Sequence, residues 1–537
     1  MFLVKVKHGL EFALKVAVWV YLLVVVGWMP FYFTKGYGHI GSDKGDLYRA
    51  VAVPVLFVAF ILWMARGVLR RWILLKTWGV KVAFRNFAME LSVLDLFMIW
   101  YFMSVALSFV LQEYYMVGYW GHDSWPMGLH THLSMLGAYF VISKNFIGEK
   151  VFCGLLLAVT TVVFGLGILN RYGVYPIPME YANPSFISTV GNINWFCGYW
   201  SVTAWLGPIF YWAGEYGSGA KGRWIRIGLG CLATIALALG IVQGSDSGMI
   251  TLAVVLLTLF CSSVRNAEKF RRFLELLLMV CGICITVNLA DRLFPGALTY
   301  KVGVLKILAE SWIPWAMGAL CLVWYIVFRR RWDGAEFSPA FWKKCRKVVL
   351  ILLAVSLVSY VILGILNTVL PGGVPGLAGK ALFTFDGHWG NSRGITWAAG
   401  IKVWEGQDLL HKLVGVGPDN MADYIYSGGD LALRQTLEGW FEGERLYNAH
   451  GEWITNLANL GLFGMVTFGS MILYAFYKFF KAGAKKKLMY FLAISVLAYT
   501  VNNIFSFQTM MNLPQIFVLL AVGDALLQKI AVAKKGR

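Results

Sequence analysis

Long apolar runs separated by short polar connectors repeat along the whole chain. Most runs have roughly 17 to 24 residues, the length a helix needs to cross about 30 Å of hydrocarbon. Because backbone groups in lipid must bond within their own segment, each run predicts a helix. The pattern predicts an all-α polytopic membrane protein with about 14 transmembrane helices, or 12 to 14 if the weakest run is discounted. The runs begin near Leu10, Ala50, Val93, Leu129, Val151, Trp195, Ile227, Met249, Phe273, Trp312, Val348, Thr455, Leu488 and Asn512.

The longest connector, residues 371–454, predicts a small folded domain rather than a flexible loop. It contains Trp389, Trp397, Trp404 and Trp440, an aromatic content that disordered segments lack. Trp397 and Trp404 share one face of a helix that we expect to start near Gly394 and to end at the Gly415–Pro418 turn. Further helices are expected from Met421 to Tyr426 and from Leu431 to Trp440. The chain is therefore divided into N-terminal helices (1–179), a transmembrane core (180–370), an extracytoplasmic helical domain (371–454) and C-terminal helices (455–537).

Composition and charge agree with this class. The chain is 59% hydrophobic and 14% charged, with a formal net charge of +19. The basic clusters, such as Arg265–Arg272 and Lys485–Lys487, fall on one side of the predicted topology. By the positive-inside rule we expect both termini to be cytoplasmic. The basic residues are spread over many short segments, which argues against a nucleic-acid partner and favours contact with anionic membrane lipids.

His450 stands where the long connector returns to the membrane. An ordinary imidazole has a pKa near neutrality, so a neutral His450 is available as a general base. An isolated histidine at this position could equally be a structural residue of a helix start, with Glu452 capping the first turn. Position alone leaves the two interpretations evenly balanced.

Four ordered motifs favour the functional interpretation. They are His450 with Glu452, Asn459–Gly461 and Gly464; Gly191–Asn194 with Gly198; Gly244–Leu252; and Arg393 with Trp397 and Gly415–Pro418. Together they resemble the motifs of the O-antigen ligase / Wzy-type polymerase superfamily of GT-C-like glycosyltransferases, over about residues 180 to 520. The resemblance departs from the pattern at Gly451, where the family usually has Asn, Ser or Gln, and at Asp246, near which the family has an arginine.

The resemblance implies an inverting glycosyltransferase of cell-envelope polysaccharide biosynthesis. Such an enzyme moves a glycan from undecaprenyl pyrophosphate to an acceptor hydroxyl on lipid, glycan or cell wall, without a metal or cofactor. His450 and Glu452 would be catalytic. Arg393 is the first candidate phosphate ligand, since its planar charged fork suits phosphate oxygens. The remaining candidates for binding the pyrophosphate or glycan are Trp397, Arg434, Arg445, Lys402, Asp246 and Asn194, with Arg171 behind them.

Three alternatives stay open at this stage. The motifs do not separate a ligase from a Wzy-type polymerase. A lipid-glycan flippase or other transporter is disfavoured, because the chain shows no internal repeat and few charges within its spans. A non-catalytic scaffold is left open only by the departures at Gly451 and Asp246.

The ligand types of His122, Asp123, His130 and His132 suit a metal, yet their spacing matches no tight site, so interfacial histidines are the preferred interpretation.

Overall fold

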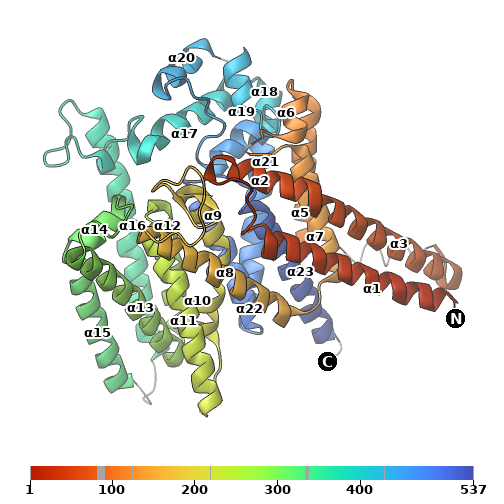
Figure 1. The fold of residues 1–537 in the computed structure, drawn as a ribbon, viewed down its shortest axis with the longest axis horizontal. Helices are drawn as coiled ribbons and strands as arrows, with labels where there is room; N and C mark the ends of the chain where they lie inside the picture. Colours follow the sequence, from red (N-terminus) through yellow and green to blue (C-terminus); the bar gives the residue numbers. More distant parts are fainter. Residues whose placement is uncertain are drawn as a thin grey trace.

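The computed structural model describes residues 2–80, 91–123, 125–217, 219–332, 338–428 and 430–535. The described chain is mainly helical, and its one sheet pairs the antiparallel strands β1 (Phe186–Ile187) and β2 (Gly191–Asn192). The all-α prediction is confirmed. Figure 1 shows a helical bundle with α17, α18, α19 and α20 gathered at one end of it.

The first half of the chain contains α1 (Phe2–Leu22), η1 (Leu23–Trp28), η2 (Tyr37–His39), α2 (Ile40–Leu47), η3 (Tyr48–Ala52), α3 (Val53–Trp78), α5 (Val93–Leu111), α6 (Tyr115–Trp120), α7 (Leu129–Asn145), α8 (Glu149–Arg171), α9 (Ile193–Thr203), α10 (Leu206–Ala213), α11 (Ala220–Val242) and α12 (Asp246–Ser263). The second half contains α13 (Ala267–Leu293), α14 (Gly303–Glu310), α15 (Ile313–Trp332), α16 (Pro339–Val369), η4 (Ala381–Phe383), α17 (Trp389–Glu405), α18 (Leu409–Val414), α19 (Met421–Asp423), η5 (Tyr424–Gly428), α20 (Leu431–Trp440), α21 (Glu452–Gly483), α22 (Lys487–Asn502) and α23 (Leu513–Lys535).

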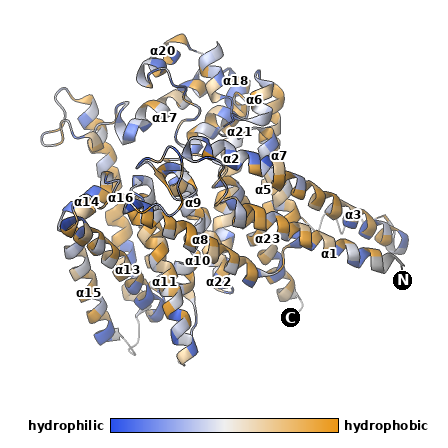
Figure 2. Ribbon diagram, viewed as in Figure 1, coloured by the Kyte–Doolittle hydropathy of each residue, from blue (hydrophilic) through white to orange (hydrophobic). Residues whose placement is uncertain are grey.

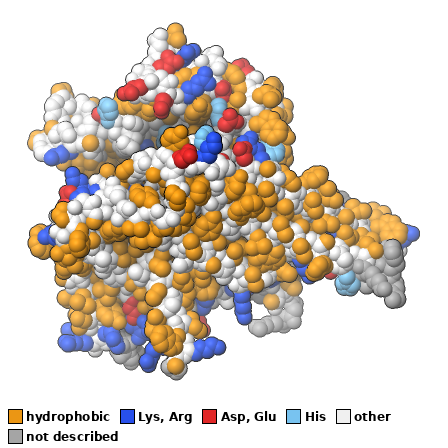
Figure 3. Space-filling model, in the orientation of Figure 1, with side chains coloured by type: hydrophobic (Ala, Val, Ile, Leu, Met, Phe, Trp, Pro, Cys, Tyr) orange, Lys and Arg blue, Asp and Glu red, His pale blue; other side chains and the backbone are white. Residues whose placement is uncertain are grey.

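Eleven helices of the described chain are long and apolar enough to cross a membrane, which establishes a multi-pass membrane protein. Every predicted run contains a helix, but the remaining three are shorter. α7 has 17 residues, α22 has 16, and the run after Trp195 is broken into α9 and α10. Figures 2 and 3 show the result as a broad hydrophobic band, with charged side chains over α17 to α20 and, opposite them, Lys and Arg at the ends of α11 and α15.

Residues 371–454 form helices packed around a core of their own. Val403, Met421, Ile425 and Leu437 are buried in it, and Ala458 of α21 belongs to the same cluster. The helix predicted from Leu431 to Trp440 is α20, and the one predicted from Met421 corresponds to α19 and η5. The first predicted helix is split, because Asp408 accepts a hydrogen bond from the backbone of His411 and starts α18 as a separate helix.

The two glycine motifs of the sequence meet where this domain contacts the bundle. Gly461 has φ 65° and interrupts α21, so that Ala458 and Asn459 lose their helical partners there. Their carbonyl oxygens accept instead from the backbone N–H groups of Val416 (3.1 Å) and Gly417 (2.9 Å). A β-carbon on Gly461 would lie 2.4 Å from the backbone of Leu413. The approach of the two backbones therefore requires glycine.

A buried lysine joins the first helices to the loop before β2. The Lys44 ammonium donates to the carbonyl oxygens of Met29 (2.8 Å), Pro30 (3.2 Å), Tyr32 (2.5 Å) and Thr189 (2.9 Å). The side chain is 1% exposed. Lys44 thus satisfies carbonyls that lie outside regular helices, which is the condition for irregular backbone at membrane depth.

Replacing Lys44 should be costly for that reason. In Lys44→Met, four carbonyls lose a charged donor, and we expect the free energy of unfolding to fall by roughly 3 kcal/mol or more. Lys150→Met removes an exposed lysine of α8 and is the control. The measurement is thermal unfolding of the two purified variants in the same detergent. Equal melting temperatures for both variants and the wild type would contradict the role given to Lys44.

Candidate functional site

His450 lies in the loop that joins α20 to α21. Its backbone is left-handed, with φ 49°, and its N–H donates to the side chain of Asn448 at 3.0 Å. A non-glycine residue holds this conformation only where its surroundings enforce it, which is common at functional sites. The strain fixes the direction in which the imidazole leaves the backbone.

The imidazole of His450 is enclosed but unbonded. Its ring packs at right angles against Phe507, with centroids 5.2 Å apart, and its buried Nδ1 atom has no hydrogen-bond partner in the described chain. Burial, and then the neighbouring charge of Arg393, lower the pKa of His450 to about 4. The ring is therefore neutral at pH 7.

Arg393 begins the regular part of α17, after three consecutive left-handed residues from Gly390 to Ser392. Its Nε donates to the carbonyl of Phe505 at 2.8 Å, and one terminal nitrogen donates to the carbonyl of Gly390 at 2.6 Å. Both partners are neutral. Burial lowers the pKa of the guanidinium, while the charge of Asp246 acts in the opposite direction. The other terminal nitrogen makes no hydrogen bond within the described residues, so an anion could bind there.

Asp246 is the first residue of α12 and acts on a neighbouring helix. Its carboxylate accepts from the backbone N–H of Val304 at 2.9 Å, in the first turn of α14. A β-carbon on Gly303 would lie 2.2 Å from the carboxylate, so a glycine is needed there. A carboxylate at a helix start is stabilised by the helix dipole. Arg393 is thus within electrostatic range of both His450 and Asp246.

Glu452 is 1% exposed and is held by three side-chain donors. Tyr499 donates to it at 2.8 Å and Gln508 at 2.7 Å, and the Asn503 amide also bonds it. A chain of bonds continues from Asn503 through Asn502 to Ser247, which lies beside Asp246. Buried polar groups of this kind are fully bonded and rigid.

The connector between α22 and α23, residues 503–512, was missed as part of the site. It supplies the carbonyl that anchors Arg393, the Phe507 ring against His450, and two donors to Glu452. Its polar side chains are buried rather than solvated, including Asn503, Ser506, Gln508 and Thr509. Such a dense run of amides and hydroxyls between two apolar spans is the signal that could have identified it.

Trp397 packs against residue Phe505 of this connector and leaves no room for a side chain at position 451. Its ring stacks on Phe505 with centroids 5.8 Å apart, and its Nε1 would lie 2.9 Å from a β-carbon on Gly451. The carbonyl of Ile504 would be equally close. The indole of Trp397 therefore occupies the space that a side chain at position 451 would need.

The other candidates are held elsewhere or lie on the surface. Arg434 pairs with Glu438 at 2.8 Å, Arg445 lies over the ring of Tyr426, and Lys402 is exposed. Asn194 lies in the first turn of α9, where Asn192 is the capping residue. Arg171 is buried, with one bond to the carbonyl of Gln243, just before the segment that leads to Asp246. None of these side chains has a hydrogen bond or ion pair to His450 or Arg393 in the described chain.

The histidines near α7 do not converge. His122 pairs with Asp423 at 3.2 Å, His132 contacts the carbonyl of Gly128, and His130 packs on Trp120. Among the described residues, no group of three or more His, Cys, Asp or Glu side chains is placed to hold a metal ion.

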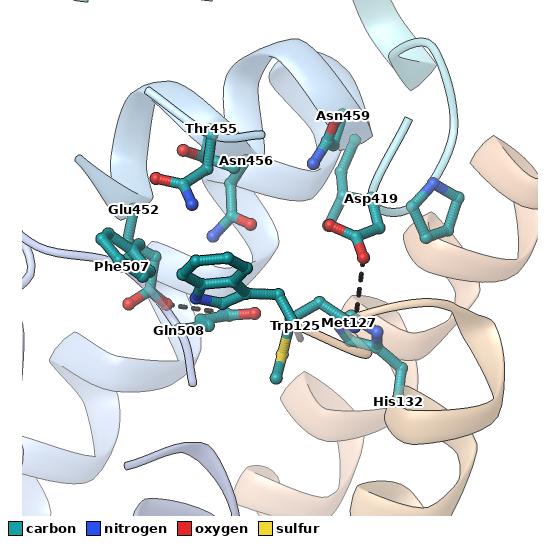
Figure 4. A pocket seen from close by; sticks show the side chains of 13 residues that line it. Trp125, Met127, His132, Asp419, Glu452, Thr455, Asn456, Asn459, Phe507 and Gln508 are labelled. Atoms are coloured by element: carbon teal, nitrogen blue, oxygen red, sulfur yellow. Dashed lines mark hydrogen bonds between the residues drawn. The ribbon is translucent and has the colours of Figure 1, made fainter. Parts of the chain in front are cut away.

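A narrow pocket opens next to Glu452, between the start of α21 and the loop before α7. Figure 4 shows Trp125 lying across it, with Glu452 and Gln508 to one side, Asp419 to the other and Asn456 above. The space that admits a water-sized group is about 30 Å³, enough for a water or one hydroxyl group. His450 and Arg393 do not line this pocket, but Phe507 does and touches His450 as well.

Comparison with known proteins gives no family model and no curated protein that matches this chain.

The contact between Gly451 and Trp397 can be tested with one methyl group. Gly451→Ala places a β-carbon 2.9 Å from two atoms, so Trp397 or the connector must shift; we expect a lower melting temperature. Gly439→Ala, in α20, meets no atom within 4 Å and is the control, with a gain of up to about 1 kcal/mol from helix propensity. Thermal unfolding of both variants measures the difference, and an unchanged Gly451→Ala would contradict the close contact.

The influence of Arg393 on His450 can be measured directly. Removing the cation in Arg393→Gln should raise the pKa of His450 from about 4 toward, but not up to, the ordinary value of 6.5, because burial remains. Histidine-ring NMR titration of purified protein, with His450→Gln used for assignment, reports this pKa. Arg434→Gln, whose guanidinium pairs with Glu438, should leave it unchanged. A pKa that does not move in Arg393→Gln would contradict the coupling.

Proposed function

We propose that the protein is an inverting glycosyltransferase that moves a glycan from undecaprenyl pyrophosphate to an acceptor hydroxyl, as the resemblance to O-antigen ligases and Wzy-type polymerases suggests. The observation that carries the proposal is a neutral His450, whose Nδ1 has no partner in the described chain, within electrostatic range of the Arg393 guanidinium, where a folded domain meets a membrane bundle. Transfer from a lipid pyrophosphate requires a base and an anion ligand that are close enough to interact.

In the proposed reaction, the pyrophosphate lies against the free terminal nitrogen of Arg393. The acceptor oxygen attacks the anomeric carbon, the bond from that carbon to the phosphate oxygen breaks, and the acceptor proton passes to the imidazole of His450. Arg393 stabilises the charge that develops on the leaving pyrophosphate, the type of interaction that lowers such barriers most. Glu452 does not need to touch the substrate, since its carboxylate is already bonded to three side chains.

The proposed function also implies an orientation of the chain in the membrane. The domain of residues 371–454 would face the outside of a bacterial cytoplasmic membrane, and both termini would lie in the cytoplasm. The basic ends of α11 and α15, opposite that domain, support this orientation through the positive-inside rule. The hydrophobic band would accommodate the polyprenyl chain of the donor.

His450→Ala and Arg393→Ala should each reduce glycan transfer by at least about a hundredfold, since His450 accepts the proton and Arg393 stabilises the charge in the transition state. Transfer is measured with purified protein, lipid-linked glycan and acceptor mixed in detergent micelles. Arg434→Ala is the matched control, because it removes an exposed guanidinium of the same domain. Melting temperature and membrane abundance are recorded for all three variants.

Each outcome of this assay identifies a function. Normal transfer by His450→Ala would remove the base from its assigned role. A wild-type protein that transfers no glycan in micelles, where no membrane separates the substrates, would exclude an enzyme and favour a flippase. In a deletion strain, accumulated full-length lipid-linked glycan indicates a ligase, and accumulated single repeat units indicate a polymerase.

A further inference from the structure

Asp419 fixes the loop that forms one wall of the pocket beside Glu452. One of its carboxylate oxygens, Oδ2, accepts from the backbone N–H groups of both His122 (2.9 Å) and Met127 (3.3 Å). The two ends of the loop are thereby joined, and Trp125 between them is held across the pocket (Figure 4). Trp125 also contacts the rings of Trp195, Tyr447 and Phe507. These contacts hold the indole of Trp125 in a fixed position in the wall of the pocket.

The pocket contains buried hydrogen-bonding atoms without partners. Asn456 is 5% exposed and His132 is 6% exposed, both line the pocket, and neither Asn456 Nδ2 nor His132 Nε2 has a partner in the described chain. The indole Nε1 of Trp125 is unbonded as well. Buried polar atoms are rarely left unbonded in folded proteins, so several in one pocket favour the binding of a polar group there.

These atoms include both donors and acceptors. Asn456 Nδ2 and Trp125 Nε1 can only donate. His132 Nδ1 lies 3.0 Å from the carbonyl of Gly128, so it carries the ring proton and leaves Nε2 as an acceptor. The hydrogen bonds of Asp419 to His122 and Met127 involve only its Oδ2 atom, so Oδ1 is a further acceptor.

This mixture discriminates between ligands. A phosphate accepts hydrogen bonds and needs donors or cations, while a metal ion needs acceptors only. A hydroxyl group donates one bond and accepts others, and it fits the available space of about 30 Å³. The ring of Trp125, which is half-buried and lines the pocket, suits the apolar C–H groups of a sugar.

We propose that this pocket binds a sugar ring of the acceptor glycan by inserting one of its hydroxyl groups between Asn456, His132 and Asp419, with Trp125 as the stacking wall. The identification of the sugar as the acceptor rests on the proposed function. The pocket is near the proposed base, since the ring of Phe507 lines the pocket and also packs against His450. Trp125 and Asn456 are then residues that determine acceptor specificity, and Asp419 positions Trp125.

The test is direct binding of sugar, independent of transfer. The probe is a mixture of oligosaccharides released by mild acid from the surface polysaccharides of the host that produces this protein. Saturation-transfer NMR with purified protein in detergent should detect their binding. Asn456→Ala and Trp125→Ala should each weaken it by roughly tenfold, the effect of one lost hydrogen bond or ring contact. Asn456→Ala breaks no bond within the described protein, so it should fold normally.

His130→Gln is the matched control, because His130 lies on the same helix as His132 but outside the pocket, against Trp120. It should bind like the wild type. Absence of binding to the wild type, or equal binding by Asn456→Ala and the wild type, would overturn the proposal. Weaker binding of inorganic pyrophosphate by Asn456→Ala would also overturn it, since the pocket would then be an anion site.

The same experiment separates this inference from the proposed function. His450→Ala should bind the oligosaccharides like the wild type, because His450 does not line the pocket. If His450→Ala also transfers glycan normally, the proposed mechanism fails while the sugar pocket stands. If transfer requires His450 but Asn456→Ala leaves sugar binding and the acceptor KM unchanged, the mechanism stands and the pocket fails.

Discussion

The site depends on one contact between two backbones, at Gly415 and Gly461. A β-carbon on Gly415 would lie 2.2 Å from the carbonyl of Asn459, and one on Gly461 would meet the backbone of Leu413. This contact allows the N–H groups of Val416 and Gly417 to bond the carbonyls freed by the break in α21. It therefore fixes residues 371–454 on the first turns of α21. His450 lies two residues before α21, so its position depends on this contact.

The buried connector between α22 and α23 completes the arrangement from the other side. It bonds Arg393 through a backbone carbonyl and Glu452 through side-chain amides. Three segments far apart in sequence therefore hold one another: α17 with Arg393, the start of α21 with Glu452, and the connector. The interior is rigid because its polar groups are paired with neutral donors and acceptors, while a few atoms facing the pocket remain unbonded.

The sequence predicts the positions of the helices better than the contacts between segments that are far apart in the chain. Hydropathy locates the eleven helices of the described chain that are long and apolar enough to cross a membrane, and periodicity locates α20 at Leu431–Trp440, because both signals are local. The split before α18 was missed because the cap at Asp408 depends on a single side chain, which the spacing of Trp397 and Trp404 does not report. The bond between Asp419 and the backbone of His122 joins residues 297 positions apart in sequence, and the bond between Arg393 and Phe505 joins residues 112 positions apart. No local pattern contains that information.

Electrostatic coupling between Arg393 and His450 has a consequence for the proposed reaction. The guanidinium charge lowers the pKa of the imidazole, to about 4 together with burial, which makes His450 a weak base before the donor binds. An anion bound to Arg393 would offset that charge and raise the pKa toward its ordinary value. Binding and proton affinity are linked, so the same coupling strengthens binding of the anion when His450 is protonated. The base would then reach its useful strength only when the pyrophosphate is in place, which protects the site from proton transfer without a donor.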